Sequence, residues 1–431
     1  MTTITSEFVN LAETCAAGFG VEKLPIAIVE HPLGGIAPET AASRADKVIE
    51  DIVFKAIRFI PKAKSSKTKN VYPASTVDVA DMIEDINDLY YRNGWTDGLP
   101  IIPPTEERVE KMLSGTRLKP DQLIALIPPR MGAATVQVIA INAVMAGAKP
   151  EHLPLLISAV ESAVQPEVEL RRWMTTTRPN FVSMFVQGPI TKELGIHYGQ
   201  SALLPGPKPN AVIGRAFNLT TRLLGGTIFL DNRVGTMTTL GMPNYSSCLG
   251  ENEDAMPKGW NPLRVDCGYT PEDSVVSIFG TTLPLMQNDH DSTDGKGVLI
   301  STCYLIGGQL GRSGGKDLGG MVILFGPEHA ASIARDGYSK EDVKQFIFDN
   351  AKIPRENLLR SGMWYIVYEQ QPEWIRKQLT DNVPMIPAFD SPDQITISVA
   401  GGAGKQSILR IGYANPPPTL IQDATFTRAG R

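Results

Sequence analysis

The sequence contains few of the residues that form covalent cross-links or metal sites. It has four cysteines and five histidines in 431 residues, and no pair of cysteines has the C-x-x-C spacing. This composition excludes a disulfide-stabilised scaffold and a zinc site of recognised spacing, and no metal is predicted. Free thiols persist in a reducing compartment, so we expect a cytoplasmic protein.

The chain also lacks an excess of positive charge and a long apolar run. Its 41 Lys and Arg residues are outnumbered by 46 Asp and Glu residues, which gives a formal net charge of −5. Such a chain has no basic surface to attract nucleic acid or an anionic membrane. The most apolar stretch, residues 136–148, is too short to span a membrane, and residues 1–20 do not have the pattern of a secretory signal. We expect neither nucleic acid nor a membrane as partner.

Glycine and proline, in contrast, are abundant. The 39 glycines and 33 prolines are spread along the chain and predict many tight turns and backbone-lined loops. With 42% apolar and 20% charged residues, the composition is that of a folded globular protein, and the length allows two or three domains. No repeat of fixed period is seen.

The first 60 residues predict an incomplete parallel α/β unit. A short strand is expected at residues 2–6, an amphipathic helix at 7–18, a buried strand at 24–30 and a long helix at 39–59. Strand–turn–helix units of this kind build parallel sheets, but a self-sufficient sheet needs more strands. The fold class is therefore predicted as α/β, with a partial βα domain over residues 1–60.

A polar, Lys-rich linker over residues 61–75 is expected to join this unit to a large mixed α/β substrate-binding domain over 76–431, with room for two subdomains. Helices are predicted over 77–92, 105–113, 132–148, 150–164, 210–224, 327–336, 340–350 and 372–379. Strands are predicted over 181–187, 298–306, 321–325 and 395–399.

Four polar residues in the first part of the large domain are candidates for the site, with Thr96, Asn142 and Arg215 expected to bind a substrate and Asp97 expected to be catalytic. Asp97, next to Thr96 in a loop between two helices, suits a general base or a group that orients a substrate, or it belongs to an Asp-Gly turn. Asn142 lies inside an apolar helix, so its amide must find a partner in a ligand or in a neighbouring backbone. Arg215, near a helix start, suits either an anion or a structural ion pair.

A glycine-rich turn after the strand at 395–399 is a candidate anion site. Backbone amides of Gly401, Gly402 and Gly404 and the ammonium of Lys405 suit a carboxylate or phosphate, although a plain β-turn has the same sequence. The turn is not a Walker A loop, because Gln406 follows the lysine. No G-x-G-x-x-G fingerprint follows a strand, so neither nicotinamide nor flavin is predicted, and the cofactor stays unknown.

Residues 245–254 are the most suggestive stretch for catalysis. They place a thiol, Cys248, close to the carboxyl groups of Glu251, Glu253 and Asp254. Cys248 is a candidate nucleophile and Glu251 a candidate proton carrier. Because nearby carboxylates raise the pKa of a thiol, a positive partner such as Arg215 or a histidine is also expected.

The segment LPIAIVEHPLGG at residues 24–35 resembles the end of the redox domain of the UGSC-motif selenoprotein family, which is related to the B subunit of glycine reductase. The stretches WTDGLP, GPITKELGI and VAGGAGK look like the long C-terminal region that accompanies this domain in some relatives. The resemblance implies redox chemistry at a selenocysteine or cysteine in a U/C-x-x-C turn. It also implies that His31, which matches the family's histidine, assists ionisation of that group; a turn histidine bonded to backbone is the alternative.

The U/C-x-x-C turn is not found in this chain, and Cys15 does not match it. We therefore expect a homo-oligomer, or a hetero-oligomer with a chain that supplies the thiol or selenol and covers the open strand edge. Three functions stay open. The first is an enzyme, or its larger subunit, for thiol-dependent reductive cleavage or a lyase step on a small polar or anionic molecule. The second is a hydrolase or hydratase of a small acid, amide or nitrile that uses Cys248 and Glu251. The third is a non-catalytic partner subunit of a redox complex.

Overall fold

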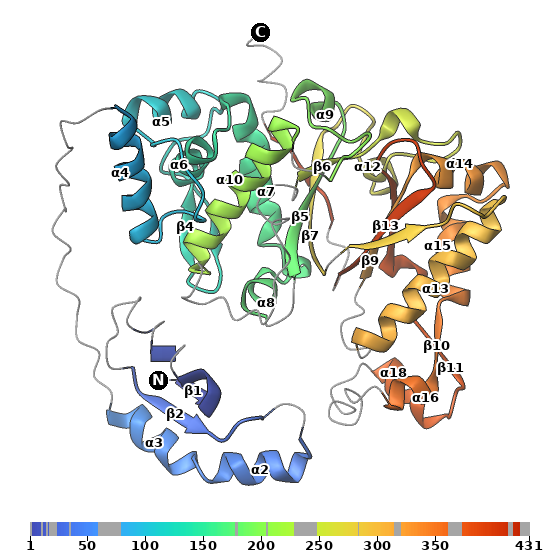
Figure 1. Cartoon of the computed structure of the whole chain (residues 1–431), viewed down its shortest axis with the longest axis horizontal. Helices are drawn as coiled ribbons and strands as arrows, with labels where there is room; N and C mark the ends of the chain where they lie inside the picture. Colours follow the sequence, from blue (N-terminus) through green and yellow to red (C-terminus); the bar gives the residue numbers. More distant parts are fainter. Residues whose placement is uncertain are drawn as a thin grey trace.

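The computed structural model describes residues 2–9, 12–13, 16, 24–33, 36–58, 79–176, 180–203, 206–227, 248–282, 284–313, 320–360, 373–412 and 417–422. Helices and a mixed sheet alternate along these residues, which confirms the α/β class (Figure 1). The predicted linker over 61–75 and Cys15 lie outside the described residues. The predicted domain boundaries stay predictions.

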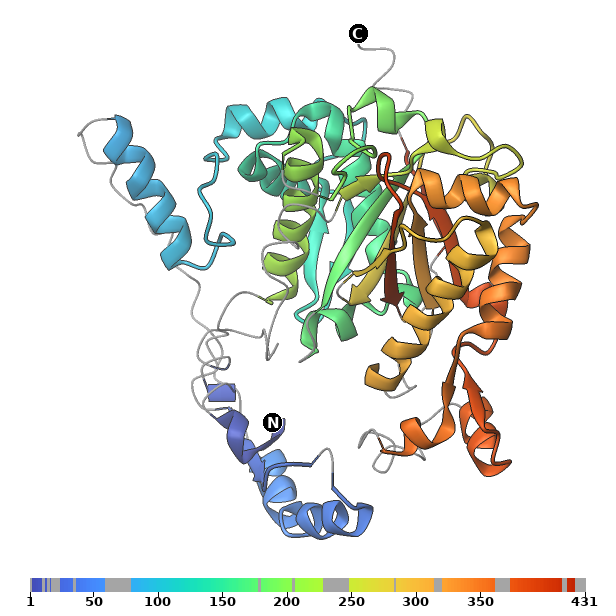
Figure 2. The same ribbon diagram turned by 45° about the vertical axis from the view of Figure 1, so that its right-hand side comes forward.

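The N-terminal unit is a two-stranded parallel sheet with two helices. Strand β1 (Thr2–Thr5) pairs in parallel with β2 (Ile26–Val29), as the sequence predicted, and α2 (Pro38–Asp46) and α3 (Ile49–Arg58) follow. The single long helix predicted over 39–59 is wrong, because the chain turns between α2 and α3. α3 packs against β2, while α2 buries none of its residues. In both views this unit lies apart from the large sheet (Figures 1 and 2).

The large sheet has eight strands. Six of them form a continuous path in the order β12-β9-β13-β7-β5-β6, while β8 pairs with β13 and β14 pairs with β7. Their bounds are β5 (Asn180–Gln187), β6 (Cys248–Gly250), β7 (Val275–Thr282), β8 (Leu285–Asn288), β9 (Gly320–Phe325), β12 (Ile395–Val399), β13 (Gln406–Gly412) and β14 (Thr419–Leu420).

This sheet consists of two halves with the same topology. In the first half β5 is parallel to β6 and antiparallel to β7; in the second half β9 is parallel to β12 and antiparallel to β13. Between β7 and β13, Thr281 and Gly412 are the one paired position among the residues that the structure describes. The sequence analysis missed this duplication, because no constant spacing relates the two halves.

Both halves have a Gly-Pro pair directly after their first strand, although Gly188 has a φ of 94° and Gly326 a φ of −65°. Gly188-Pro189 follows β5 and Gly326-Pro327 follows β9. A Cβ atom on Gly188 would collide with the carbonyl oxygen of Asp273, just before β7, and one on Gly326 would collide with the carbonyl oxygen of Gln406, where β13 begins. Only glycine allows the turn to approach the antiparallel neighbour this closely.

Helices cover the outer faces of the two halves. In the first half these include α6 (Val136–Ala146), α7 (Leu153–Ala163) and α10 (Lys208–Gly225), and in the second half α13 (Gly295–Ser313), α14 (Pro327–Arg335) and α15 (Lys340–Asn350). Side chains alternate along each strand, so Met184 packs in the outer core while Phe185 points to the other face. There Phe185 joins residues of the second half, such as Leu324, in a small third core.

Most predicted helices and strands are confirmed with shifts of a few residues. The helix predicted over 132–148 is partly wrong, because its first four residues form β4 (Gly132–Thr135), paired with β3 (Leu123–Ile127). The strand predicted over 298–306 is wrong, because this stretch lies inside α13. A short apolar run gives the same periodicity in a buried strand and a buried helix. Strands β7 and β13 were missed.

The remaining elements are the 14-residue helix α4 and several shorter helices and strands. They are η1 (Ser6–Phe8), α4 (Val79–Arg92), α5 (Glu106–Leu113), η2 (Pro150–His152), η3 (Pro166–Val168), α8 (Leu170–Thr175), α9 (Ile190–Glu193), η4 (Glu253–Ala255), α12 (Leu263–Asp266), β10 (Lys352–Pro354), α16 (Arg355–Arg360), α18 (Glu373–Thr380), β11 (Met385–Pro387) and η6 (Pro392–Gln394). Among the described helices, none combines the length and apolarity needed to cross a membrane.

Candidate functional site

The carboxyl ends of β6 and β12 meet, although these strands lie at opposite ends of the strand order. The backbone amide of Asn252 donates to the carbonyl of Val399 at 2.8 Å, and its side chain donates to the carbonyl of Gly401 at 2.8 Å. The structure thus brings together the acidic stretch after β6 and the glycine-rich turn after β12, two segments that the sequence marked separately. Carboxyl ends of strands are where α/β sheets commonly bind ligands.

Glu251 is the buried carboxyl group at this junction, with 1% of the residue exposed. Its Oε1 accepts hydrogen bonds from the hydroxyl of Ser398 at 2.5 Å and from the amide of Leu263 at 3.0 Å. Burial raises the pKa of Glu251 to about 7, although the Ser398 hydrogen bond and the positive charge of Lys340 act to lower it. A carboxyl group with a pKa near neutrality can hold or release a proton at physiological pH.

The other two carboxyl groups of the stretch are held by positive partners. Glu253 accepts from the buried guanidinium of Arg264 at 2.5 Å and from the amide of Gly188 at 3.0 Å. Asp254 accepts from Lys192 at 2.5 Å and from the hydroxyl of Tyr198 at 2.7 Å, and these hydrogen bonds lower the pKa of Asp254. Glu251 differs from Asp254 because burial outweighs hydrogen bonds and raises its pKa.

Several side chains of this site were missed by sequence reasoning. Ser398, Arg264, Lys192 and Tyr198 come from four different parts of the chain, and no spacing in the sequence connects them to Glu251. A serine on an inward-facing strand position and an arginine within a four-residue helix have no distinctive signal. Only the tertiary fold brings them together.

Cys248 lies on the opposite face of the chain from Glu251. Residues three apart in an extended strand point to opposite sides, and the Cys248 side chain packs in the outer core of the first half. Burial raises the pKa of this thiol, so it is protonated at neutral pH and is not activated as a nucleophile. Burial also raises the pKa of Cys303 to about 12. The predicted pairing of Cys248 with Glu251 in catalysis has no geometric support, and the role of Cys248 stays a prediction.

Asp97 and Arg215 form a bidentate ion pair. Arg215 Nε donates to Asp97 Oδ2 and Arg215 Nη2 donates to Asp97 Oδ1, both at 2.9 Å, while Thr96 Oγ1 donates to the Leu99 carbonyl at 3.0 Å. Burial raises the pKa of Asp97, but the hydrogen bonds and charge of Arg215 outweigh it and the net pKa is lowered. This geometry matches the structural ion pair that the sequence left open. The substrate-binding roles of the three residues stay predictions.

Asn142 lies elsewhere in the fold, within α6. Its Nδ2 donates to the Val138 carbonyl one turn earlier at 2.9 Å. Its Oδ1 is buried and has no hydrogen-bond donor among the residues that the structure describes. A ligand-binding role for Asn142 stays a prediction.

The two ends of the turn after β12 form hydrogen bonds with different parts of the chain. Gly401 has a φ of 92°, which favours glycine, and its amide donates to the Tyr198 carbonyl at 2.8 Å. Gly402 packs against Gln200, so this end of the turn faces the Glu251 junction. At the other end Gly404 donates to Glu328 at 3.1 Å, and Lys405 Nζ donates to the carbonyls of His290 and Ser292, each at 3.0 Å. The predicted anion site has its ammonium group engaged by backbone.

His31 belongs to the N-terminal unit. Its Nδ1 lies 2.9 Å from Thr5 Oγ1, its backbone amide donates to Ser6 Oγ at 3.3 Å, and its ring contacts Phe8 edge-on. In both views this unit lies apart from β6 (Figures 1 and 2). His31 and Glu251 are therefore not brought together within one copy, and a redox role for His31 stays a prediction.

One family model matches the N-terminal unit. Residues 1–57 match the model of the UGSC family. A comparison with curated proteins and one with solved structures each find no match. The match covers β1, β2, α2 and α3, and it does not extend to the sheet that holds Glu251. Within the described ranges, no group of three or more His, Cys, Asp or Glu side chains is arranged to hold a metal ion.

Proposed function

We propose that this chain is an enzyme, or the larger subunit of one, that carries out thiol-dependent reductive cleavage or a lyase step on a small polar or anionic molecule. Glu251 is the proton carrier. The observation that supports this proposal is a buried carboxyl group with a pKa of about 7 at the junction of β6 and β12. A structural carboxyl group that is buried is more commonly paired with a positive side chain, as Glu253 is with Arg264.

Both reactions need a group that moves one proton at neutral pH. In a lyase step the Glu251 carboxylate accepts a proton from the substrate as the leaving group departs with the electron pair of its bond. In a reductive cleavage a dithiol supplies two electrons and becomes a disulfide, while protonated Glu251 gives its proton to the leaving group. Ser398 holds Glu251 Oε1 in place and orients the proton.

The thiol or selenol of a reductive reaction would come from a partner chain. The UGSC family match over residues 1–57 supports a redox setting for the N-terminal unit. Cys248 and Cys303 are buried and burial raises the pKa of both thiols, so neither is prepared to attack a substrate. The same Glu251 would also activate water in a hydratase or hydrolase of a small acid, amide or nitrile, which needs no dithiol.

The test compares Glu251→Gln with Glu253→Gln in the full chain. Each protein is incubated with glycine, lactate, acetamide or acetonitrile, with and without dithiothreitol, and the products are read by mass spectrometry. We expect turnover that Glu251→Gln abolishes and Glu253→Gln retains, because a neutral amide keeps the shape of Glu251 but cannot exchange a proton. Dependence on dithiothreitol identifies reductive cleavage, and its absence favours a lyase or hydratase. Turnover that survives Glu251→Gln contradicts the proposal.

A further inference from the structure

We propose that the side-chain oxygen of Gln187 accepts a hydrogen bond from the protonated carboxyl group of Glu251, so that Gln187 is a positioning residue for the proton. This role rests on the proposed function, because it deepens the part that Glu251 plays as the proton carrier. Two observations carry it. Gln187 lies directly beside Glu251 in the sheet, and its buried oxygen has no donor among the described residues.

Gln187 and Glu251 are neighbours across β5 and β6. The two strands pair in parallel up to Val186 and Gly250, and the amide of Glu251 then donates to the Val186 carbonyl at 2.9 Å. This hydrogen bond continues the ladder by one step, so the next pair is Gln187 and Glu251. Neighbouring strands lie about 4.8 Å apart, which brings the two side chains within reach of each other.

Both side chains lie on the face of the sheet that carries the small third core. Phe185 and Leu249 belong to this core. Because side chains alternate along a strand, the residues two positions later point the same way, and these are Gln187 and Glu251. Ser398, which donates to Glu251 Oε1 at 2.5 Å, reaches the same face from β12. The glutamine and the glutamate are therefore side by side in the interior.

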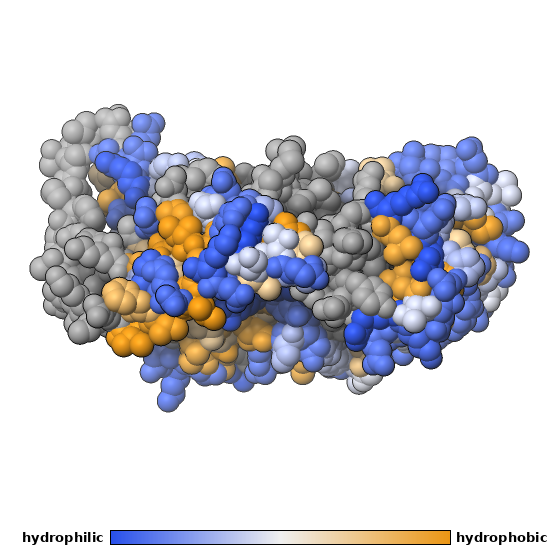
Figure 3. Space-filling view, turned by 90° about the horizontal axis from the view of Figure 1, so that it is seen from below, coloured by the Kyte–Doolittle hydropathy of each residue, from blue (hydrophilic) through white to orange (hydrophobic). Residues whose placement is uncertain are grey.

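The Gln187 side chain is fully enclosed, and only half of its amide group is bonded. Figure 3 shows hydrophilic residues over much of the surface, where water can bond them, but Gln187 is 0% exposed. Its Nε2 donates to Ser277 Oγ at 2.9 Å, whereas its Oε1 is buried and has no donor among the residues that the structure describes. Buried polar atoms are nearly always bonded, so this oxygen needs a donor.

The orientation of the amide group directs the free oxygen toward Glu251. β5 lies between β7 and β6, and Gln187 Nε2 bonds Ser277 on β7. Nε2 also lies 3.5 Å from the Phe185 carbonyl, which only accepts hydrogen bonds and so identifies this end of the amide as the donor. Since the oxygen and the nitrogen point to different sides of the amide carbon, Oε1 is directed away from β7, to the side of β6.

The protonated form of Glu251 supplies the missing donor. A carboxylate only accepts hydrogen bonds, whereas a carboxylic acid has one O–H to donate. Glu251 Oε1 already accepts from Ser398 and, at 3.0 Å, from the amide of Leu263, whose contact with Oε2 is longer at 3.2 Å. The proton therefore belongs on Oε2. A hydrogen bond from Oε2 to Gln187 favours the neutral acid, in the same direction as burial.

The charged groups around Glu251 do not take over this role. Lys340 on α15 lowers the pKa of Glu251 and Glu253 raises it, while burial raises the pKa of the nearby Cys267 thiol and keeps it uncharged at neutral pH. Lys340 Nζ donates to Asp266 at 2.7 Å. These charges act through space and give the proton no direction, whereas a hydrogen bond to Gln187 fixes it on one oxygen.

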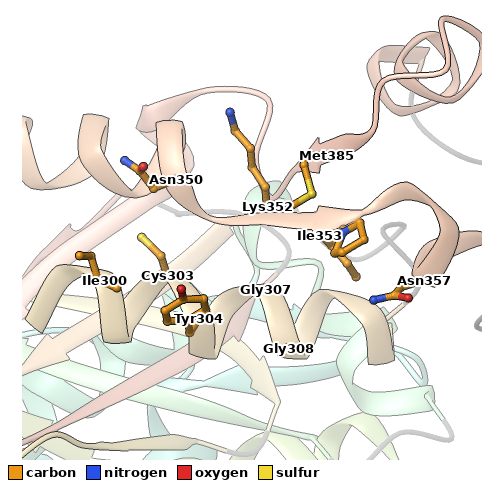
Figure 4. A pocket seen from close by; sticks show the side chains of 11 residues that line it. Ile300, Cys303, Tyr304, Gly307, Gly308, Asn350, Lys352, Ile353, Asn357 and Met385 are labelled. Atoms are coloured by element: carbon orange, nitrogen blue, oxygen red, sulfur yellow. The ribbon is translucent and has the colours of Figure 1, made fainter. Parts of the chain in front are cut away.

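A ligand in an open hollow is the other partner to consider for the Gln187 oxygen. The hollow between α13 and β10, of about 600 Å³, is lined by side chains such as Ile300, Ile353 and Met385 (Figure 4). A second hollow, of about 580 Å³, lies beside β8. Neither of these two hollows is lined by Gln187 or Glu251. The oxygen is thus enclosed against Glu251 and opens to neither hollow.

The first experiment measures the titration midpoint of Glu251 in the full chain by ¹³C NMR, with and without the Gln187 oxygen. Gln187→Met keeps the length of the side chain and removes the acceptor. We expect the midpoint to fall by roughly half to one pH unit, the effect of one hydrogen bond. Gln287→Met is the matched control, because Gln287 is a buried glutamine on β8 that is bonded at both ends of its amide, and it should leave the midpoint unchanged.

The sign of the shift decides the outcome. An unchanged midpoint in Gln187→Met overturns the proposal. A rise overturns it as well, because it would show that Gln187 donates to the ionised carboxylate instead of accepting from the acid.

The second experiment needs no substitution at Gln187 and stands even if Gln187→Met does not fold. The wild-type chain is labelled at the side-chain carbonyl carbon of glutamine and titrated. We expect one glutamine signal to shift with the same midpoint as Glu251, because the hydrogen bond exists only in the protonated form. Glu251→Met should abolish that shift. If no glutamine signal follows Glu251, the proposal is wrong.

Failure of this role and failure of the proposed function can be told apart. Turnover that survives Glu251→Gln contradicts the proposed function and leaves the NMR results on Gln187 as they stand. A wild-type midpoint near 7 that Gln187→Met does not move contradicts only the role of Gln187. Where turnover depends on Glu251, Gln187→Met should move the pH profile of kcat by the same amount as the midpoint. A lower rate with an unmoved profile indicates a packing defect and contradicts the positioning role.

Discussion

The two halves of the large sheet share a framework but close its carboxyl end in different ways. In the first half the turn amide of Gly188 donates to the side chain of Glu253 at 3.0 Å. In the second half the equivalent amide of Gly326 donates to the Gln406 carbonyl at 3.1 Å and to Ser407 Oγ at 3.2 Å. A turn closed by a side chain keeps charged groups at the strand ends, whereas a turn closed by neighbouring backbone does not need them.

The titratable groups at the strand ends also differ between the two halves. In the second half buried His329 contacts Ser407 Oγ at 2.7 Å and the Asp289 carbonyl at 3.1 Å, and burial lowers its pKa. Lys405 is likewise bonded to carbonyl oxygens. In the first half Glu251 keeps a pKa near 7. His329 and Lys405 in the second half are thus engaged by Ser407 and backbone carbonyls, whereas the strand ends of the first half hold the buried carboxyl group of Glu251.

The largest expected effect tests whether the two halves are equivalent. Gly188→Ala and Gly326→Ala should each lower the free energy of unfolding by about 4 kcal/mol or more, because the new Cβ collides with a backbone carbonyl in both halves. Urea unfolding measures the change. Gly259→Ala is the control for Gly188→Ala, since its φ of 93° is positive like that of Gly188 but nothing lies within 4 Å of the added atom, and it should cost about 1–2 kcal/mol. If Gly188→Ala or Gly326→Ala leaves the free energy of unfolding unchanged, the two turns are not equivalent.

The second-largest expected effect concerns the ion pair between Arg215 on α10 and Asp97 in the loop after α4. Arg215→Met should destabilise the fold by about 3 kcal/mol, because it leaves the buried carboxylate of Asp97 without its cation. Adding Asp97→Asn should recover much of the loss, and urea unfolding of the single and double variants measures both. If Arg215→Met leaves stability unchanged while a substrate-binding defect appears, the pair serves the ligand and not the fold.

The third effect contrasts the pH dependence of the two halves. Because the folded-state pKa of Glu251 is raised from about 4.5 to about 7, its contribution to stability is full below pH 4.5 and is lost as pH rises toward 7. The loss is at most about 3 kcal/mol, at 1.4 kcal/mol per pKa unit. Glu251→Gln should flatten this slope when unfolding is measured at pH 5, 6 and 7.5.

Asp289 in the second half has the opposite sign. Burial raises its pKa, but hydrogen bonds from Ser301 and Ser292 outweigh this and lower the pKa to about 2. Its contribution is therefore present above about pH 4 and is lost as pH falls toward 2. Stability that rises in the wild type between pH 5 and 7.5 would contradict the contrast.

The smallest effect concerns the hydroxyl that orients Glu251. Ser398→Ala should cost about 1–2 kcal/mol, since it removes a hydrogen bond to a buried carboxyl group. It should also raise the pKa of Glu251 further, because that bond favours the charged form. Thr396→Ala, two residues earlier on the same face of β12, is the matched control and should leave the pKa of Glu251 unchanged.

Local patterns predicted much of the fold but little of the site. The N-terminal βα unit, α10 and strands β5, β9 and β12 follow from apolar runs and turn residues. The periodicity of residues 298–306 was misleading, because a helix that is apolar on most sides has no polar face to reveal its period. Glu251 and Ser398 are 147 residues apart, and only the curved sheet brings them together. The separation of Cys248 from Glu251 depends on the strand register, which a three-residue strand does not reveal.

The pKa of Glu251 in the full chain tests the central claim most directly. The side-chain carboxyl carbon is observed by ¹³C NMR on protein labelled at glutamate, and its signal is assigned by its loss in Glu251→Gln. The account predicts a titration midpoint near pH 7. A midpoint near 4.5, the ordinary value for glutamate, would contradict it and leave Glu251 as a structural carboxylate.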